Sequence, residues 1–249
     1  MAGNVLITIV IASYNSGATI RKALQSVRDQ SFQDWECLVV DGASKDDTIN
    51  IVQKFVDEDP RFRYISEPDK GIYDAFNKGW KNAKGEWVYY LGSDDTLTKD
   101  GMSLLAEEID EHFAIISGDT NLMRTDGTSR VLPSGMPELG CHQGMVMQRT
   151  VMEEMGGFDM SYKIIADYDL IVRTLNKGWD MKLVHVTVAN FQVGGTSQSL
   201  NNFLVYAKER YKINVKFKRL KHPHLSLLNT IVRKYGSVTI RSLIGKLVK

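Results

Sequence analysis

Apolar and polar positions alternate in blocks along the first 91 residues. Four short apolar runs, rich in β-branched or aromatic residues, are typical of buried strands: residues 5–11, 37–40, 62–65 and 87–91. Between them, apolar residues recur at helical spacing in residues 18–30, 48–56 and 71–83. Strands that alternate with helices predict an α/β fold, in which a parallel sheet is flanked by helices.

The pattern is weaker in the second half of the chain. Residues 113–148 are less regular: residues 115–119 are a candidate strand, and Pro133, Gly135 and Pro137 indicate a loop. Residues 166–176 have helical spacing and end at Gly178, a good stop signal. From residue 225 onward two short amphipathic helices are expected, with apolar residues at 228, 231, 235, 240, 243, 244 and 247.

Charge divides the chain at about residue 200. Residues 201–249 hold twelve Lys and Arg against one acid, Glu209, whereas residues 1–200 hold 19 basic and 29 acidic residues. We therefore expect a catalytic-type domain over 1–200 and a basic helical tail over 201–249. Such asymmetry indicates an anionic partner surface. We favour a membrane surface rich in anionic lipid as the partner of the tail. The alternative is that the tail is a helix pair folded onto the domain.

Composition narrows the setting of the protein. With 249 residues, 43% hydrophobic and 24% charged, the chain suits one large α/β domain. Two cysteines, Cys37 and Cys141, make a disulfide framework improbable and favour a reducing compartment. The N-terminus lacks signal-peptide features, and the longest apolar run, residues 5–12, is too short to span a bilayer. We expect a cytoplasmic protein without a nucleic-acid partner.

Polar residues follow each of the four predicted strands. They are Ser13–Asn15, Asp41, residues 67–69 and Ser93–Asp95. In parallel sheets ligands bind beyond the carboxyl ends of the strands, so these four clusters predict one shared crevice. The adjacent carboxylates of Asp94 and Asp95 suit Mg²⁺ or Mn²⁺ completed by a diphosphate; alternatively, they cap the following helix.

Three further positions are open to two interpretations. The Asp41 carboxylate could accept a hydrogen bond from the N–H of uracil or from a ribose hydroxyl. Alternatively, it is only part of an Asp-Gly turn. Tyr14 suits stacking on a base, or ordinary packing. Asp167 begins a helix, where the helix dipole favours an acid, but it also suits a base that removes a proton from a hydroxyl. His142 and Gln143 could contact an acceptor, although a lone His is often structural. Zinc-type clusters and the common phosphate-loop motifs are absent from the sequence.

Taken together, these motifs resemble family 2 glycosyltransferases of the GT-A fold. The likeness spans about residues 5–200 in order, with matching stretches at 8–15, 39–48, 67–79, 85–95, 156–159 and 166–170. The stretch Glu67-Pro-Asp-Lys-Gly-Ile-Tyr-Asp-Ala75 is similar to a branch that makes bacterial surface polysaccharides of the colanic-acid and O-antigen type.

The resemblance implies an inverting, hexosyltransferase-type enzyme that uses a nucleotide sugar and Mn²⁺ or Mg²⁺. It implies that Asp94 and Asp95 bind the metal and that Asp167 is the general base. The residues expected around the nucleotide sugar are Ser13, Tyr14, Asn15, Asp41, Asp69, Asn77, Ser93 and Asp94. Two positions depart from the family pattern: the usual Asp-x-Asp-Asp begins with Gly92, and a metal-proximal His is replaced by the stretch 192–197.

For the acceptor we expect a polyprenyl-diphosphate-linked saccharide at the inner face of the cell membrane, with a UDP-sugar as the donor. The alternatives are transfer to polyprenyl phosphate, whose phosphate nucleophile needs no base, and an inactive module that binds a nucleotide sugar. A nucleotidyltransferase is disfavoured, because Ser13–Ser16 is not a glycine-rich activating loop.

Overall fold

The structure is a computed structural model that describes residues 5–135, 142–192 and 200–219. The chain divides into two compact units. The first comprises residues 1–160 and 166–194, and the second comprises residues 161–165 and 195–249. The prediction that a basic tail begins at residue 201 stays a prediction.

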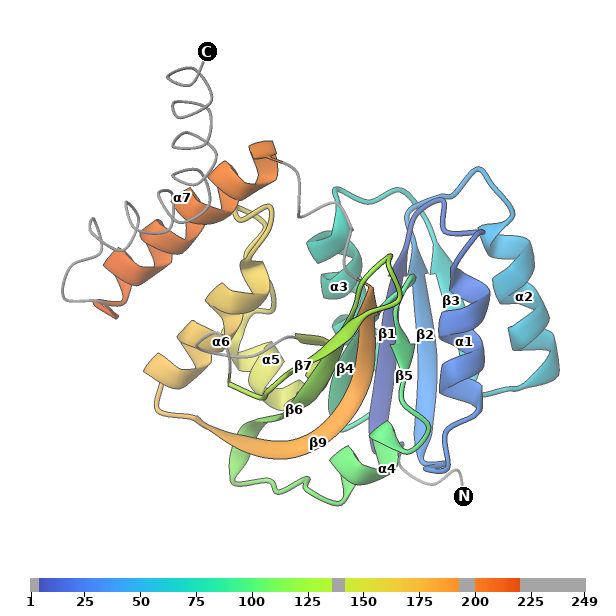
Figure 1. The fold of residues 1–249 in the computed structure, drawn as a ribbon, viewed down its shortest axis with the longest axis horizontal. Helices are drawn as coiled ribbons and strands as arrows, with labels where there is room; N and C mark the ends of the chain where they lie inside the picture. The colour runs from blue at the N-terminus through green and yellow to red at the C-terminus, as the bar shows by residue number, and fades with distance from the viewer. Residues whose placement is uncertain (1–4, 136–141, 193–199, 220–249) are drawn as a thin grey trace, which may run out of the picture. The chain divides into compact units, whose positions relative to one another are not determined.

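The first half of the chain forms the predicted strands and helices. The elements are β1 (Ile7–Ser13), α1 (Ile20–Arg28), β2 (Trp35–Asp41), α2 (Thr48–Glu58), β3 (Phe62–Ser66), α3 (Ile72–Lys81) and β4 (Trp87–Gly92). The strands pair in parallel in the order β3-β2-β1-β4 (Figure 1). Ser13 lies opposite Asp41 across β1 and β2, so the polar residues that follow these strands meet at one edge.

These strands are continuous apolar runs because both faces of the sheet are covered. Residues 7, 9, 10 and 11 of β1 are fully buried. Helix α1 buries Ile20, Ala23, Leu24 and Val27, which lie on one side at helical spacing. Each buried aliphatic side chain stabilises the fold by about 1.5–3 kcal/mol relative to exposure.

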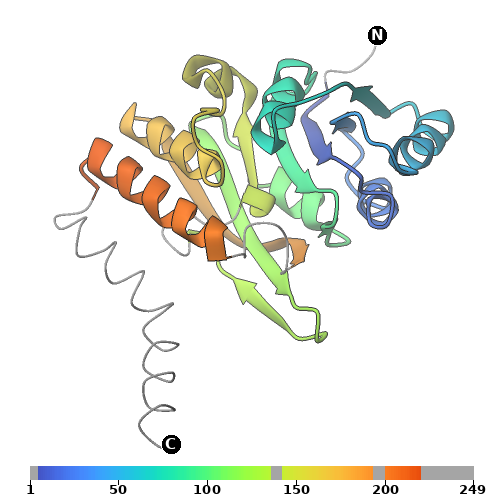
Figure 2. The ribbon, with the colours of Figure 1, turned by 90° about the horizontal axis from the view of Figure 1, so that it is seen from above.

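The second half is more regular than the sequence indicated. It contains β5 (Thr96–Leu97), α4 (Gly101–Ala106), β6 (Phe113–Met123), β7 (Ser129–Leu132), the 3₁₀ turn η1 (His142–Gly144), β8 (Met145–Gln148), α5 (Arg149–Met155), α6 (Ala166–Asn176) and β9 (Asp180–Gln192). These strands continue the sheet as β4-β8-β6-β9-β5, with β7 beside β6 (Figures 1 and 2). The candidate strand at 115–119 is the middle of the longer β6, and α6 has the predicted bounds.

The sheet reverses its winding between β1 and β4. The chain passes from β1 to β2 on one side, and β4 later pairs with the other side of β1. Such a switch point opens a crevice between the loops that follow the two strands. The loops after β1 and β4 carry Ser13–Asn15 and Ser93–Asp95, so the fold brings two of the predicted polar clusters to the switch point.

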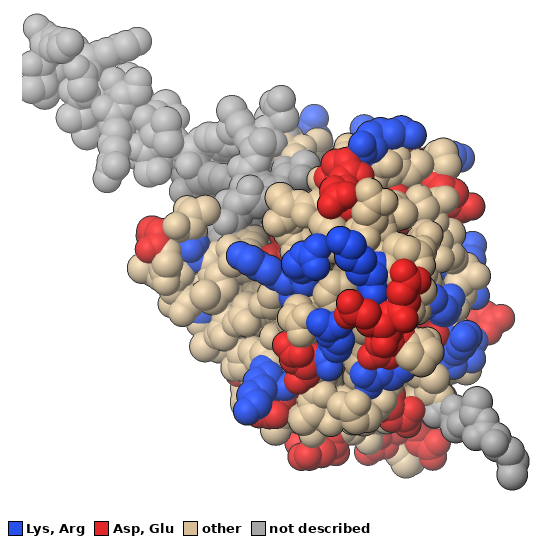
Figure 3. Space-filling view, turned by 90° about the vertical axis from the view of Figure 1, so that its right-hand side faces the viewer, with Lys and Arg blue, Asp and Glu red and all other residues tan. Residues whose placement is uncertain are grey.

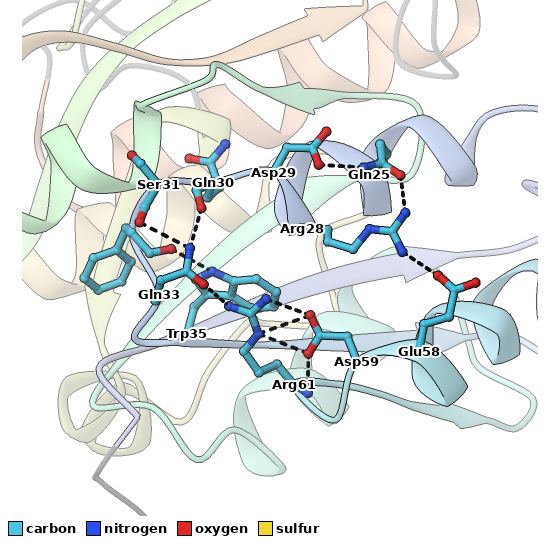
Figure 4. Close-up of polar contacts among 11 residues, drawn as sticks. Gln25, Arg28, Asp29, Gln30, Ser31, Gln33, Trp35, Glu58, Asp59 and Arg61 are labelled. Atoms are coloured by element: carbon cyan, nitrogen blue, oxygen red, sulfur yellow. Dashed lines mark hydrogen bonds and ion pairs between the residues drawn. The ribbon is translucent and has the colours of Figure 1, made fainter.

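Polar contacts join the end of α1, the segment that leads into β2 and the segment after α2 (Figure 4). The Arg61 guanidinium lies 3.9 Å from the Trp35 ring centroid and binds both carboxylate oxygens of Asp59. Arg28 contacts Glu58 at 2.5 Å. Basic and acidic side chains are interspersed over the face that lies at the right-hand side of Figure 1 (Figure 3). Ion pairs near the surface stabilise a fold by about 0–1 kcal/mol each. We therefore assign these pairs a small contribution to stability and no role in ligand binding.

The second unit is described through α7 (Leu200–Lys216) and the short segment 161–165. Glu209 of α7 is buried, and its carboxylate accepts the backbone N–H groups of Lys163, Ile164 and Ile165. The two helices predicted beyond residue 225 lie outside the described residues. None of the helices in the described ranges is long and apolar enough to cross a membrane.

Candidate active site

The loops after β1 and β4 touch at the switch point. The hydroxyls of Ser16 and Ser93 lie 2.9 Å apart. Ser93 directly precedes the Asp94–Asp95 pair, so this contact brings the predicted metal-binding acids beside the loop that contains Tyr14 and Asn15. Two of the four polar clusters expected around the crevice are thereby joined.

Asp41 is fully buried and holds the strand ends together. Its Oδ1 accepts from the hydroxyls of Ser13 at 3.0 Å and Ser44 at 2.5 Å, and its Oδ2 accepts from the Ser44 amide at 2.9 Å and the Ser66 hydroxyl at 2.8 Å. Four donors match the roughly four lone-pair positions of a carboxylate. A direct contact with a base, which stays a prediction, would require one of these hydroxyls to turn away.

Tyr14 and Asp69 flank the same glycine. A Cβ atom at Gly42 would lie 2.6 Å from Oδ2 of Asp69 and 3.3 Å from Cδ2 of Tyr14. Tyr14 is 64% exposed, and Asn15 accepts from the Lys45 amide at 2.8 Å. The Asp69 carboxylate and the Tyr14 ring therefore close over Gly42 and leave no room for a side chain there.

Asn77 faces a different part of the molecule. Its amide N donates to the carbonyl of Phe158 at 2.9 Å, and its amide O accepts from the Phe158 N–H and the Trp80 indole, both at 2.9 Å. Asn77 thus holds the segment 156–159 against α3. Its predicted contact with the donor stays a prediction.

Asp94 and Asp95 lie in different environments. Asp94 is exposed, whereas Asp95 is 1% exposed. Oδ1 of Asp95 accepts from the backbone N–H of Gln192 at 2.8 Å, and its Oδ2 accepts from the side-chain amide of Gln143 at 3.2 Å. Burial, with a further contribution from the charge of Asp94, raises the pKa of Asp95 to about 6. Asp95 is therefore held in place, while Asp94 is open to a ligand.

The two carboxylates converge over Gly92. A Cβ atom there would lie 2.4 Å from Oδ2 of Asp95 and 3.0 Å from Oδ1 of Asp94. Within the described ranges, no group of three or more His, Cys, Asp or Glu residues could hold a metal ion. Two carboxylates still suit Mg²⁺ or Mn²⁺, because such ions are commonly held by one or two carboxylates plus substrate phosphates. Of the stretch 192–197, only Gln192 is described.

Asp167 lies in the first turn of α6 and is held by three donors. Its Oδ2 is 2.9 Å from Nδ1 of His142, and its Oδ1 accepts from the Tyr73 hydroxyl at 3.3 Å and the Tyr168 amide at 2.8 Å. Burial raises the pKa of Asp167, but the hydrogen bond and positive charge of His142 outweigh it, and the pKa lies below its usual value. Asp167 is therefore ionised at neutral pH, as a general base must be.

The turn η1 connects the two groups of acids. His142 binds Asp167, and the next residue, Gln143, binds Asp95. The sequence left open whether His142 and Gln143 contact an acceptor or are structural; in the structure both contact the acids, and an acceptor contact stays a prediction. Tyr73 was missed, because its helical spacing indicates only a core residue and the Asp167 that it binds lies 94 positions away.

The parallel strands, the switch point and the curled nine-stranded sheet define an α/β fold of the GT-A type. The model of Glycosyl transferase family 2 matches residues 8–163, so the chain belongs to this family. It is 28% identical to a "PGL/p-HBAD biosynthesis glycosyltransferase" of Mycobacterium bovis, over 98% of this chain and 96% of that protein. It is 29% identical to the "GalNAc(5)-diNAcBac-PP-undecaprenol beta-1,3-glucosyltransferase" of Campylobacter jejuni, over 50% of this chain and 41% of that protein.

Solved structures have the same fold. S. aureus TarS 1-349 in complex with UDP-GlcNAc superposes with a TM-score of 0.70 at 17% identity, covering 92% of this chain and 73% of that one. The mannosyltransferase PcManGT of Pyrobaculum calidifontis, in complex with GDP-Man and Mn²⁺, gives 0.68 at 17% identity, covering 90% and 68%. The protein is a glycosyltransferase with a GT-A fold.

Proposed function

We propose that the protein transfers a sugar, with inversion, from a UDP-sugar to a hydroxyl of a polyprenyl-diphosphate-linked saccharide. The observation that carries this proposal is the geometry around Asp167: a 23% exposed carboxylate that pairs with His142, whose neighbour Gln143 donates to Asp95 of the Asp94–Asp95 pair. Inverting transfer needs this combination of one base and a separate group that holds the diphosphate.

The donor lies in the crevice between the loops after β1 and β4. Tyr14 stacks on the base, and Asp69 and Asp41 bind its polar edge and the ribose. Asp94, supported by Asp95, would hold a divalent cation together with the diphosphate. When bound, the cation neutralises charge on the departing diphosphate. The acceptor oxygen attacks the anomeric carbon, the bond from that carbon to the diphosphate oxygen breaks, and Asp167 takes the hydroxyl proton.

Two facts support a lipid-linked acceptor at a membrane surface. The Campylobacter relative is named for an undecaprenol-linked acceptor. In addition, α7 and the residues just after it carry six Lys and Arg against Glu209: residues 208, 210, 212, 216, 218 and 219. Each basic residue near an anionic surface contributes about 1 kcal/mol. Intact protein should bind vesicles of anionic lipid, and a variant with the exposed Lys208, Lys212 and Lys216 changed to Gln should bind them less; equal binding contradicts the membrane contact.

The test of the reaction is release of UDP or GDP across a panel of nucleotide sugars, with Mn²⁺ and a lipid-diphosphate disaccharide. Asp167→Asn should lower transfer by about 10²–10⁴-fold, which is the usual contribution of a general base, and should still bind UDP. Asp126→Asn, in an exposed turn, is the matched control. NMR of the product reports inversion at the anomeric carbon.

The alternatives give different results in the same assay. Transfer to polyprenyl phosphate that persists in Asp167→Asn would favour the phosphate acceptor, because that nucleophile has no proton to remove. Calorimetric binding of UDP with Mn²⁺ but no release from any donor would favour an inactive binding module. If activity persists fully in EDTA, the metal has no role.

A further inference from the structure

Three donors determine how the Asp167 carboxylate is oriented. They come from three places: the His142 ring on η1, the Tyr73 hydroxyl on α3, and the Tyr168 amide on α6. A carboxylate has roughly four lone-pair positions, so these donors leave room for one more. The side chain is 23% exposed, so the remaining position is open to an acceptor hydroxyl.

The groups that orient Asp167 are themselves fixed by packing. An ionised carboxylate only accepts hydrogen bonds, so Nδ1 of His142 must carry the proton in this contact. The His142 ring packs edge-on against Phe76, with centroids 5.9 Å apart and planes at 73°. The Tyr73 ring stacks on Phe158 at 5.6 Å. Burial and the charge of Asp167 raise the pKa of Tyr73 well above its usual value, so its hydroxyl stays a donor.

Gln143, the residue after His142, holds an acid of the Asp94–Asp95 pair in the same way. The Gln143 amide donates to Oδ2 of the buried Asp95 at 3.2 Å, and the Gln143 carbonyl accepts from the Tyr89 hydroxyl. Two consecutive residues of one 3₁₀ turn therefore hold two carboxylates: the proposed base Asp167 and the metal-side acid Asp95. A turn anchored at both residues sets the separation between these carboxylates.

On the basis of the proposed function, we propose that His142 and Gln143 are positioning residues: His142 orients the base Asp167, Gln143 orients Asp95, and the turn that contains them fixes the distance between the metal-side acids and the base. Neither residue needs to contact the acceptor. Misplacing a reacting group by about 1 Å can cost about 100-fold in rate, so the separation has a measurable effect.

The role of His142 depends on a donor at Nδ1. An Asn side chain can place an amide N near the Nδ1 position, whereas Ala places nothing there. We expect His142→Ala to lower kcat by about 100-fold while the donor and acceptor KM values change less than about threefold. His142→Asn should recover about tenfold of the loss. Tyr73→Phe, which removes one hydroxyl, should lower kcat by about tenfold.

The matched control is His112→Ala. His112 makes the same kind of pair, with Nδ1 2.7 Å from Asp110, but it is 84% exposed and lies away from the site. Its variant should keep wild-type kcat. Because His142 and Gln143 belong to one turn, the loss in the double variant His142→Ala/Gln143→Ala should be smaller than the product of the two single losses.

Each outcome has a defined meaning. A change in acceptor KM with unchanged kcat in His142→Ala would overturn the positioning role and make His142 an acceptor contact. A His142→Asn variant no better than His142→Ala would also overturn it. So would long-range ¹⁵N NMR of His142 that shows the proton on Nε2 rather than Nδ1. If the wild-type protein releases no nucleotide from any donor, the proposed function itself fails, which is a distinct result.

Discussion

Nδ1 of His142 lies 2.9 Å from Oδ2 of Asp167. This contact reverses the effect of burial on the Asp167 carboxylate, because burial disfavours the charged form while the hydrogen bond and the positive charge of the ring favour it. The lowered pKa keeps Asp167 ionised at neutral pH, and the neighbour that causes this shift lies on another element.

The pH dependence of the reaction should report this control. The pKa of Asp167 is lowered, so the base stays ionised as the pH falls and loses its charge only below its usual range. In His142→Ala the raising effect of burial remains, so the pKa of Asp167 rises, and the acid limb of kcat/KM should move to higher pH when it is measured at saturating Mn²⁺, which keeps the neighbouring Asp95 from titrating in the same range. Tyr73 and the Tyr168 amide also face Asp167 and are present in both proteins. The same acid limb in both proteins would contradict this account.

Asp95→Asn should increase stability while lowering activity. The pKa of Asp95 is raised from 3.8 to about 6, so its ionisation opposes folding at pH values above both the unfolded and folded pKa. The penalty is on the order of 3 kcal/mol, because each unit of pKa shift corresponds to about 1.4 kcal/mol. Denaturant unfolding in EDTA should show the variant more stable at pH 7.5, with the gain lost near pH 4. The same gain at both pH values would contradict burial of the charge.

Gly92 should not tolerate an acid in its place, although the resemblance noted from the sequence implies an acid at this position. Any Cβ at this position would lie 2.4 Å from Oδ2 of Asp95, which is too close for an ordinary contact. Gly92→Ala and Gly92→Asp should therefore both move the acids apart and weaken Mn²⁺-dependent UDP binding by about tenfold or more, corresponding to about 1.4 kcal/mol. Calorimetry with and without Mn²⁺ measures this. Tighter Mn²⁺ binding in Gly92→Asp would instead show that the missing acid limits the metal site.

The parallel half of the fold could be predicted because its strands are continuous apolar runs that are buried on both faces. The long β9 could not, because its residues alternate irregularly between buried and exposed. The two-residue β5 exists because it pairs with β9, Thr96 with Asn190, and no local pattern contains that information. Whether such a segment forms a strand depends on pairing with a distant segment and not on the intrinsic β-propensity of its residues.

For the site, the sequence could indicate which carboxylates follow strands but not what holds them. Asp41 and Asp167 both stood out, yet one is enclosed by four donors and the other keeps an open side. That difference depends on serine hydroxyls from neighbouring strands and on Tyr73, whose contact with Asp167 spans 94 positions. Contacts of this range follow from the folded chain and are not visible in a local motif.

Glu209 should stabilise the segment 161–165 through its three backbone contacts. Its carboxylate accepts the N–H groups of Lys163, Ile164 and Ile165 at 2.7, 3.1 and 3.3 Å. Leaving a buried donor without an acceptor costs about 1–3 kcal/mol, so Glu209→Ala should speed amide hydrogen exchange at 163–165 and lower the melting temperature. Glu209→Gln keeps one acceptor oxygen and should fall between. Lys208→Ala, at the exposed neighbour on α7, is the control and should leave exchange unchanged; if Glu209→Ala behaves like this control, the carboxylate does not hold the segment.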